Sequence, residues 1–135
     1  MNGAALADAA QMLVGSRYLL HGRNPEVGID CIGLVLAALR AIGLTPREPP
    51  PYALRNRTIA PHRRIARAMG FEPASQPAKS GDIVLVAPGA AQFHLLVAAR
   101  DGQFIHAHAG LRRVVMTPGP ICWPIAGHWR LPPQS

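Results

Sequence analysis

The sequence predicts a single domain over residues 1–135 with an α+β fold, in which N-terminal helices pack on a small antiparallel sheet. Hydrophobic residues make up 49% of the chain and charged residues 16%, which indicates a packed core. Segments with helical spacing of apolar residues fill the first half, and segments typical of strands follow Gly81. Helices followed by strands are the order typical of α+β proteins.

The helices are predicted from apolar spacing together with residues that begin or end helices. Segments 4–14, 31–42 and 58–69 have this spacing. Gly15 and Ser16 are expected to end the first helix. Asp30 is a good N-cap for the second helix, and Gly43 is a good residue to stop it.

The second half is predicted to form the sheet. Strands are expected at 83–86, 94–99, 103–108 and 113–116, with a last strand at 128–131. Proline, glycine and polar residues predict loops at 21–28, 45–57 and 71–80.

The formal net charge is +7, and nearly all the positive charge is arginine because Lys79 is the only lysine. Such a surface favours anionic partners, such as nucleic acid, acidic lipid or an anionic wall polymer. Binding to single-stranded nucleic acid uses aromatic residues among basic ones. Aromatic residues make up only 5% of the chain and segment 55–67 has none, so we expect no nucleic-acid partner.

The N-terminal segment has no basic residue before its first apolar run, and Asp8 lies inside that run. It therefore predicts an amphipathic helix rather than a secretion signal. No apolar run is long enough to span a membrane. We expect synthesis in the cytoplasm without a signal peptide, and action at the cell wall only if a tail or another route delivers the protein.

Cys31 stands where the first turn of the second helix is expected. The free N–H groups and the positive dipole end there favour a thiolate, and the same N–H groups can hold an oxyanion. The alternative is a buried structural cysteine. Asp30 is read as a helix cap whose charge opposes ionisation of the thiol. The other cysteine, Cys122, is expected to serve packing.

Several motifs follow one another in a recognisable order: GSRY at 15–18, DCIGLV at 30–35, SGDIV at 80–84, HLLV at 94–97 and DGQFIHA at 101–107. Together they resemble the NlpC-like cell-wall cysteine peptidases over about residues 11–117. The HGR sequence at 21–23 and the short chain look closest to the phage-tail and gene-transfer-agent branch.

The resemblance implies a papain-like fold and a Cys-His-His site without a cofactor. It implies Cys31 as nucleophile, His94 as base, His106 as the group that orients His94, and Tyr18 near the oxyanion. The usual substrate is a peptidoglycan stem peptide, often cut between D-glutamate and diaminopimelate. Phage-tail or gene-transfer-agent proteins are the partners implied by that branch.

The sequence departs from the family pattern at four positions, which are Arg17, Ile32, Leu95 and Leu96. Proline is common at the first, a small residue at the second, and Val-Gly at the last two. We expect these side chains to reshape the substrate groove. Asp30, Ile32 and His108 are assigned to substrate contacts.

The loop between the second and third predicted strands decides which histidines meet. With a two-residue turn, His94 falls opposite Ala109, and His106 points to the other face. With a three-residue loop at 100–102, His94 faces His108, and His106 is a diagonal neighbour on the same face. Catalysis therefore requires the odd-length loop. Register favours His108 as the partner of His94, whereas the family resemblance favours His106.

Other readings stay open. His94, His106 and His108 can also be read as metal ligands, but no cysteine or carboxylate pattern with zinc spacing accompanies them, so no metal is expected. An amidase or acyl transferase acting on another small amide uses the same site. A non-catalytic basic tail adaptor is the non-enzymatic alternative. His62 and His128 are expected to be surface or structural residues.

Overall fold

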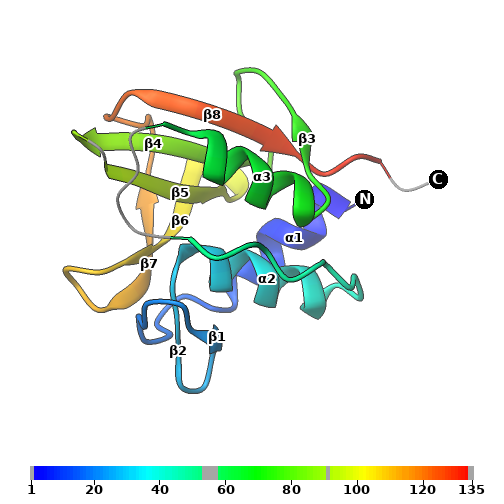
Figure 1. The fold of residues 1–135 in the computed structure, drawn as a ribbon, viewed down its shortest axis with the longest axis vertical. Helices are drawn as coiled ribbons and strands as arrows, with labels where there is room; N and C mark the ends of the chain where they lie inside the picture. Colours follow the sequence, from blue (N-terminus) through cyan, green and yellow to red (C-terminus); the bar gives the residue numbers. More distant parts are fainter. Residues whose placement is uncertain (1, 53–57, 91, 134–135) are drawn as a thin grey trace.

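The computed structural model describes residues 2–52, 58–90 and 92–133. The predicted α+β class is confirmed by helices and a six-stranded antiparallel sheet of order β3-β8-β4-β5-β6-β7, beside a two-stranded ribbon β1-β2 (Figure 1). The elements are α1 (Asn2–Gln11), β1 (Arg23–Asn24), β2 (Gly28–Ile29), α2 (Cys31–Ala41), α3 (Ala60–Ala68), β3 (Glu72–Pro73), β4 (Ile83–Gly89), β5 (Gln92–Ala98), a 3-10 turn η1 (Arg100–Gly102), β6 (Gln103–His108), β7 (Arg113–Pro118) and β8 (Ile125–Arg130).

The central helix α2 begins and ends where its sequence predicts. The Asp30 carboxylate accepts the Gly33 N–H through Oδ1 at 2.8 Å, which caps the helix at Cys31. Gly43, just past the last turn, has a φ of 88°, a backbone conformation that favours glycine. Most of α2 is buried, and the helix contacts α1, β5 and β6.

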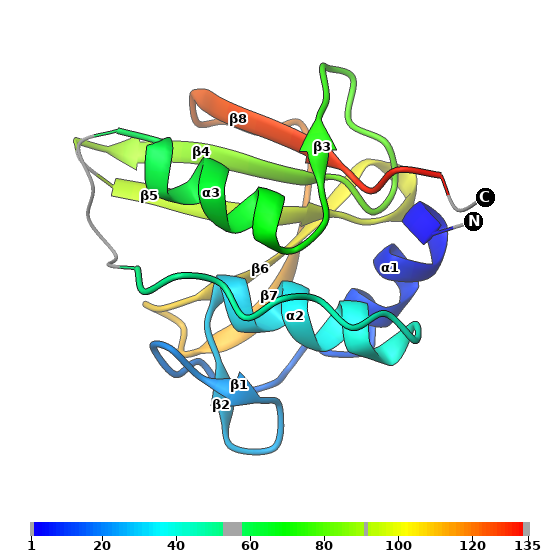
Figure 2. The same ribbon diagram turned by 45° about the vertical axis from the view of Figure 1, so that its right-hand side comes forward.

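The sheet has two unlike faces because side chains alternate along each strand. One face packs on the helices and forms the large core, with residues such as Leu85, Val97 and Ile105. The opposite face carries a smaller cluster of Val84, Val86 and Leu96, against which Phe104, Ile121 and Trp123 pack. Figures 1 and 2 show α1, α2 and α3 beside the sheet, with the segment after α2 running back between α2 and α3.

The β5–β6 hairpin has the three-residue loop that the sequence analysis required. Val97 pairs with Ile105, Ala98 with Phe104, and the Ala99 N–H donates to the Gln103 carbonyl at 2.8 Å. Asp101 and Gly102 have positive φ angles of 61° and 73°. This register places His94 and His106 on the same face of the sheet as Leu96.

Some short elements differ from the sequence prediction. The segment expected as a polar loop at 21–28 contains β1 and the start of β2, and the expected loop at 71–80 contains β3. The predicted loop at 45–57 is irregular as far as residue 52, and residues 53–57 lie outside the described residues. Within the described ranges, no helix is long and apolar enough to cross a membrane.

Candidate active site

One cavity of about 450 Å³ gathers most of the side chains that the sequence singles out. It is lined by Tyr18, Cys31, His94, His106 and His108. The other lining residues are Pro88, Gln92, Phe93, Ala107, Ala109, Gly110 and Trp123. The start of α2, strand β5 and strand β6 therefore meet at this cavity, although they lie up to 77 positions apart in the chain (His108 minus Cys31).

The Cys31 thiol is held in its protonated form. Burial raises its pKa to about 12, with the Asp30 carboxylate as the second cause, and the backbone N–H groups of Leu95, Ile32 and Cys31 act in the opposite direction. Both expected influences are present, with the N–H groups of the helix start favouring the thiolate and Asp30 opposing it. Burial and the neighbouring carboxylate outweigh the favourable N–H groups.

His94 makes its ring contact with His106. The His94 Nε2 and His106 Nδ1 atoms lie 2.8 Å apart, and the two rings meet edge to face. In the tautomer that carries the proton on His94 Nε2, this nitrogen donates to His106 Nδ1, and His94 Nδ1 is then unprotonated and able to act as a base. His108 is engaged elsewhere, because its Nδ1 accepts the Leu111 N–H at 3.0 Å.

Both histidines of the pair favour the neutral form. Burial lowers the pKa of His94 to about 4, with the charges of His106 and His108 adding to the effect. Burial, followed by the charge of His108, likewise lowers the pKa of His106 to about 4. At neutral pH, the cavity therefore holds a neutral thiol beside a neutral imidazole.

Tyr18 is fixed by its backbone next to the nucleophile. Its N–H donates to the Arg112 carbonyl at 3.0 Å, and Tyr18 forms a bridge with Ile29, two residues before Cys31. Burial, then the charges of Cys31 and Asp30, raises the pKa of the Tyr18 phenol to about 12. The hydroxyl keeps its proton and is available as a donor to a developing negative oxygen.

The assignment of Asp30 and Ile32 to substrate contacts is wrong. Asp30 and Ile32 are only 1% exposed, and neither is among the described residues that line the cavity. The Asp30 oxygens are occupied by intramolecular bonds, and Ile32 belongs to the core. Leu95 and Leu96 are also buried in the two clusters of the sheet, so they do not reshape the groove directly.

His62 and His128 take structural positions, whereas Cys122 does not. His128 is buried and bonded to Asp82, and His62 is buried beside Phe93. Cys122 is exposed rather than packed. Among the described residues, no three His, Cys, Asp or Glu side chains are arranged to hold a metal ion.

Trp123 lines the cavity but is not predicted from the sequence. Its ring centroid lies 6.4 Å from that of His94 in an edge-to-face arrangement. The segment that carries it contains two prolines and a cysteine and shows no periodicity, so only its place before the last strand offered a signal.

Comparisons with known proteins show the family and the fold. The model of the NlpC/P60 family matches residues 15–119. No protein with curated annotation matches the chain.

Several solved structures share the fold. NlpC2 from Trichomonas vaginalis is 20% identical with a TM-score of 0.66, over 96% of this chain and 47% of that one. The NlpC/p60 domain of the peptidoglycan hydrolase SagA is 24% identical with a TM-score of 0.60, over 87% and 90%. The peptidoglycan hydrolase RipB from Mycobacterium tuberculosis is 22% identical with a TM-score of 0.62, over 96% and 64%. The chain therefore spans less than half the length of NlpC2.

Proposed function

The chain belongs to the NlpC/P60 family, and from this premise we propose that it is a cysteine peptidase that hydrolyses amide bonds in peptidoglycan stem peptides. The observation that carries the proposal is the cavity lined by both Cys31 and His94, with His94 Nε2 at 2.8 Å from His106 Nδ1. SagA and RipB, which share the fold, are named peptidoglycan hydrolases.

The chemistry begins from uncharged groups. As the Cys31 sulfur attacks the amide carbonyl carbon, His94 Nδ1 takes the thiol proton, and the Tyr18 hydroxyl donates to the oxygen that becomes negative. The tetrahedral intermediate breaks its C–N bond, and His94 gives the proton to the leaving amine. His94 then removes a proton from water, which attacks the thioester. The C–S bond breaks, the carboxylic acid leaves, and the sulfur regains its proton.

His106 has the role of a positioning residue in this scheme. Its Nδ1 accepts from His94 Nε2 and so keeps the unprotonated nitrogen of His94 on the other side of the ring. When His94 becomes charged in the transition state, the same bond stabilises the imidazolium.

The proposal also covers the bond that is cleaved and the route by which the protein reaches the cell wall. We propose cleavage between D-glutamate and diaminopimelate, and delivery as a component of a phage tail or gene-transfer agent. The first is implied by the resemblance of the motifs at 30–35 and 94–97 to the family, and the second rests on the likeness of the HGR sequence at 21–23 to that branch. The net charge of +7 favours contact with an anionic wall polymer.

Digestion of purified peptidoglycan tests this function. We expect fragments that end in D-glutamate and fragments that begin with a free diaminopimelate amine, identified by mass spectrometry. Cys31→Ala should release neither, whereas Cys122→Ser should release both. Absence of fragments with the folded wild-type protein, tested on walls of different peptide chemistry, would contradict a peptidoglycan substrate.

A further inference from the structure

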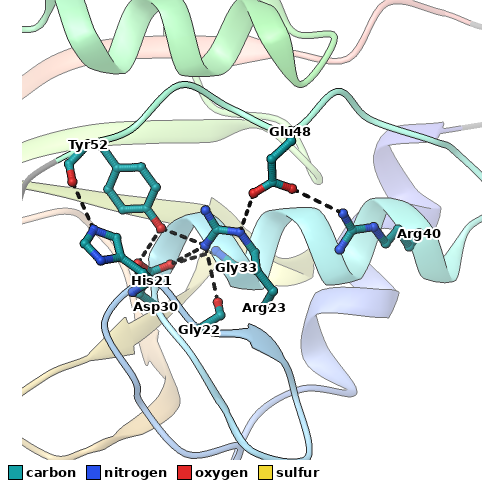
Figure 3. Close-up of polar contacts among 8 residues, drawn as sticks. All are labelled: His21, Gly22, Arg23, Asp30, Gly33, Arg40, Glu48 and Tyr52. Carbon is teal, nitrogen blue, oxygen red and sulfur yellow. Dashed lines mark hydrogen bonds and ion pairs between the residues drawn. The ribbon is translucent and has the colours of Figure 1, made fainter.

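The buried carboxylate of Asp30 lies at the centre of a network of polar contacts beside the nucleophile (Figure 3). Tyr52 donates its hydroxyl to Asp30 Oδ2 at 2.6 Å, and the His21 N–H donates to the same oxygen at 2.8 Å. Arg23 Nη1 donates to the Tyr52 hydroxyl at 2.7 Å and lies 3.6 Å from Asp30 Oδ1. Every oxygen of this carboxylate is thus engaged within the protein.

The network also anchors the segment that follows α2. The His21 Nε2 atom lies 2.9 Å from the Tyr52 carbonyl oxygen, and the Arg23 guanidinium lies over the Tyr52 ring. Arg23 Nε donates to Glu48 at 3.0 Å, and Arg40 lies on the other side of Glu48 at 3.7 Å. Figure 3 shows these side chains coming from the β1 region, from helix α2 and its N-cap, and from the segment that carries Glu48 and Tyr52.

Asp30 has two effects that oppose each other. It caps α2 and so places Cys31 at the helix start, but its negative charge is adjacent to the thiol that has to lose a proton. A like charge that close disfavours formation of a second negative charge. A cap of this kind serves catalysis best when a positive partner offsets its charge.

We propose that Arg23 and Tyr52 are positioning residues for Cys31 that act through Asp30. Arg23 supplies the offsetting positive charge, and Tyr52 transmits it by a donated hydrogen bond while holding the carboxylate in its capping position. The inference rests on the proposed role of Cys31 as nucleophile. Arg23, Tyr52 and Asp30 are absent from the described residues that line the cavity, so their effect on substrate binding is expected to be small.

Among the described residues, few groups face Asp30. From the β1 side come Arg23 and the His21 N–H, from the segment after α2 comes Tyr52, and from the site itself come Cys31 and Tyr18. Burial, followed by the bond to Asp30, raises the pKa of Tyr52, so its hydroxyl keeps the proton that it donates. Arg23 is therefore the positive group of this set.

The two cysteines permit a test with an internal standard. Iodoacetamide alkylates thiolates, and exposed Cys122 lies outside the network. The ratio of Cys31 to Cys122 labelling in one molecule, read by peptide mass spectrometry at a fixed pH, reports the ionisation of Cys31. We expect Arg23→Met to lower this ratio about tenfold, which corresponds to about one pH unit in the thiol pKa.

Matched variants separate charge from packing. Arg23→Lys keeps the charge, and its labelling ratio should stay within about threefold of the wild-type ratio. The labelling ratio of Tyr52→Phe should lie between those of Arg23→Lys and Arg23→Met. Arg40→Met removes a charge that contacts Glu48 but not Asp30, so the ratio should not change. In an Asp30→Asn background, Arg23→Met should have a much smaller effect than in the wild type.

Two results would overturn the inference. One is an unchanged ratio in Arg23→Met, with folding verified by circular dichroism. The other is an equal decrease in the Asp30→Asn background, since Arg23 would then act on the thiol directly. In turnover assays, Arg23→Met should lower kcat with KM nearly unchanged. The labelling ratio requires no turnover, so a protein that shows the expected ratios but leaves peptidoglycan intact would refute the proposed function alone.

Discussion

Cys31 and His94 are both uncharged at neutral pH, and this charge state sets how the reaction has to begin. Because the pKa of the Cys31 thiol is raised and that of the His94 imidazole is lowered, the two groups do not form an ion pair before the reaction begins. The proton therefore moves as the sulfur attacks. His94 then has to be neutral but does not have to be a strong base at the start.

The pH dependence of turnover follows from this charge state. Burial, with His106 and His108, lowers the pKa of His94 to about 4, so the base stays neutral at mildly acid pH. We expect the acid limb of kcat/KM for a stem peptide to fall well below pH 6.5, as an apparent value of the coupled His94–His106 pair. Activity is present above that limb and is lost as pH falls through it. A limb centred at pH 6.5 or higher would show that His94 is not held neutral.

The orienting residue can be identified by comparing two histidines on β6. His106→Ala removes the bond to His94 Nε2, and we expect the rate to fall by roughly 10- to 1000-fold. His106→Asn should recover part of the loss, because an amide can also accept that bond. His108→Ala should cost clearly less, because its Nδ1 is bonded to the Leu111 N–H. Turnover by the three folded variants measures this, and a greater loss at His108 would assign the role to the cross-strand neighbour.

At the scale of single residues, motif order was a better guide than local chemistry. The family resemblance predicted residues that meet in one cavity: Tyr18, Cys31, His94 and His106. It failed for Ile32, because successive residues on a helix point about 100° apart and a neighbour of the nucleophile need not face its cavity. The network of Asp30, Arg23 and Tyr52 was not predictable, because it joins residues far apart that carry no shared spacing.

At the scale of elements, β4 and β8 are tied together by the buried carboxylate of Asp82. It bonds to His128 Nε2 at 2.6 Å and to two nitrogens of Arg130 at 2.8 Å each, and it accepts the Lys79 N–H at 2.9 Å. The Ser-Gly-Asp turn therefore ends in a residue that holds the last strand against the sheet. The sequence showed the turn but not its partner strand.

Removing this carboxylate should destabilise the protein. Asp82→Asn is expected to lower the free energy of unfolding by about 2–3 kcal/mol, because it leaves partners of a buried charge uncompensated. Asp101→Asn is the matched control, since Asp101 is exposed and its positive φ suits asparagine equally well. Urea unfolding at neutral pH measures both. A loss in Asp82→Asn no greater than in the control would contradict the structural role of the network.

The same carboxylate makes a pH-dependent contribution. Burial raises the pKa of Asp82, but the bonds from Arg130, Lys79 and His128 outweigh it and hold the pKa below the ordinary 3.8. Its stabilising contribution is therefore complete above about pH 4 and is lost as pH falls below that value through the folded-state pKa. Asp82→Asn should remove this part of the acid dependence, as measured by urea midpoints between pH 2 and 6.

Helix α3 contains a second titrating group, His62, which in the part of the chain that the structure describes lacks the bonded partners that Asp82 has. His62 is 8% exposed, its Nδ1 has no hydrogen-bond partner among the described residues, and burial lowers its pKa below 6.5. The folded protein therefore disfavours the charged ring, and its stability falls as pH drops below about 6.5. We expect His62→Leu to stabilise the protein by about 1 kcal/mol and more at pH 5 than at pH 8. Arg63→Met, an exposed change in the same helix, should leave the pH dependence as it is.

The elements that could be predicted are those long enough to show a period. Helix α2 was predicted to within one residue, and β6 was predicted with its observed bounds. The two-residue strands β1, β2 and β3 were missed because a period of two cannot be recognised in so short a segment. The loop at 100–102 was predicted from a chemical requirement, since only an odd length brings the histidines to one face.

At the scale of the whole molecule, the helices and the active-site histidines use different faces of the sheet. The helices pack on one face, His94 and His106 lie on the face that carries Leu96, and the cavity that they line also receives Cys31 from the start of α2. The nucleophile thus comes from the helical half and its base from the sheet half. The family assignment and the α+β class are settled by residues 15–119, whereas the single-domain organisation and the delivery route stay predictions.

The central claim is that Cys31 is the nucleophile and His94 its base. A stem-peptide chloromethyl ketone, which places an electrophilic carbon beside the position of the scissile carbonyl, tests this most directly when followed by trypsin digestion and mass spectrometry. The account predicts an adduct on the fragment 24–40 that contains Cys31, slowed by competing stem peptide and by His94→Ala. An adduct found chiefly on the fragment 114–130 that contains Cys122, or one whose rate is unaffected by His94→Ala, would contradict it.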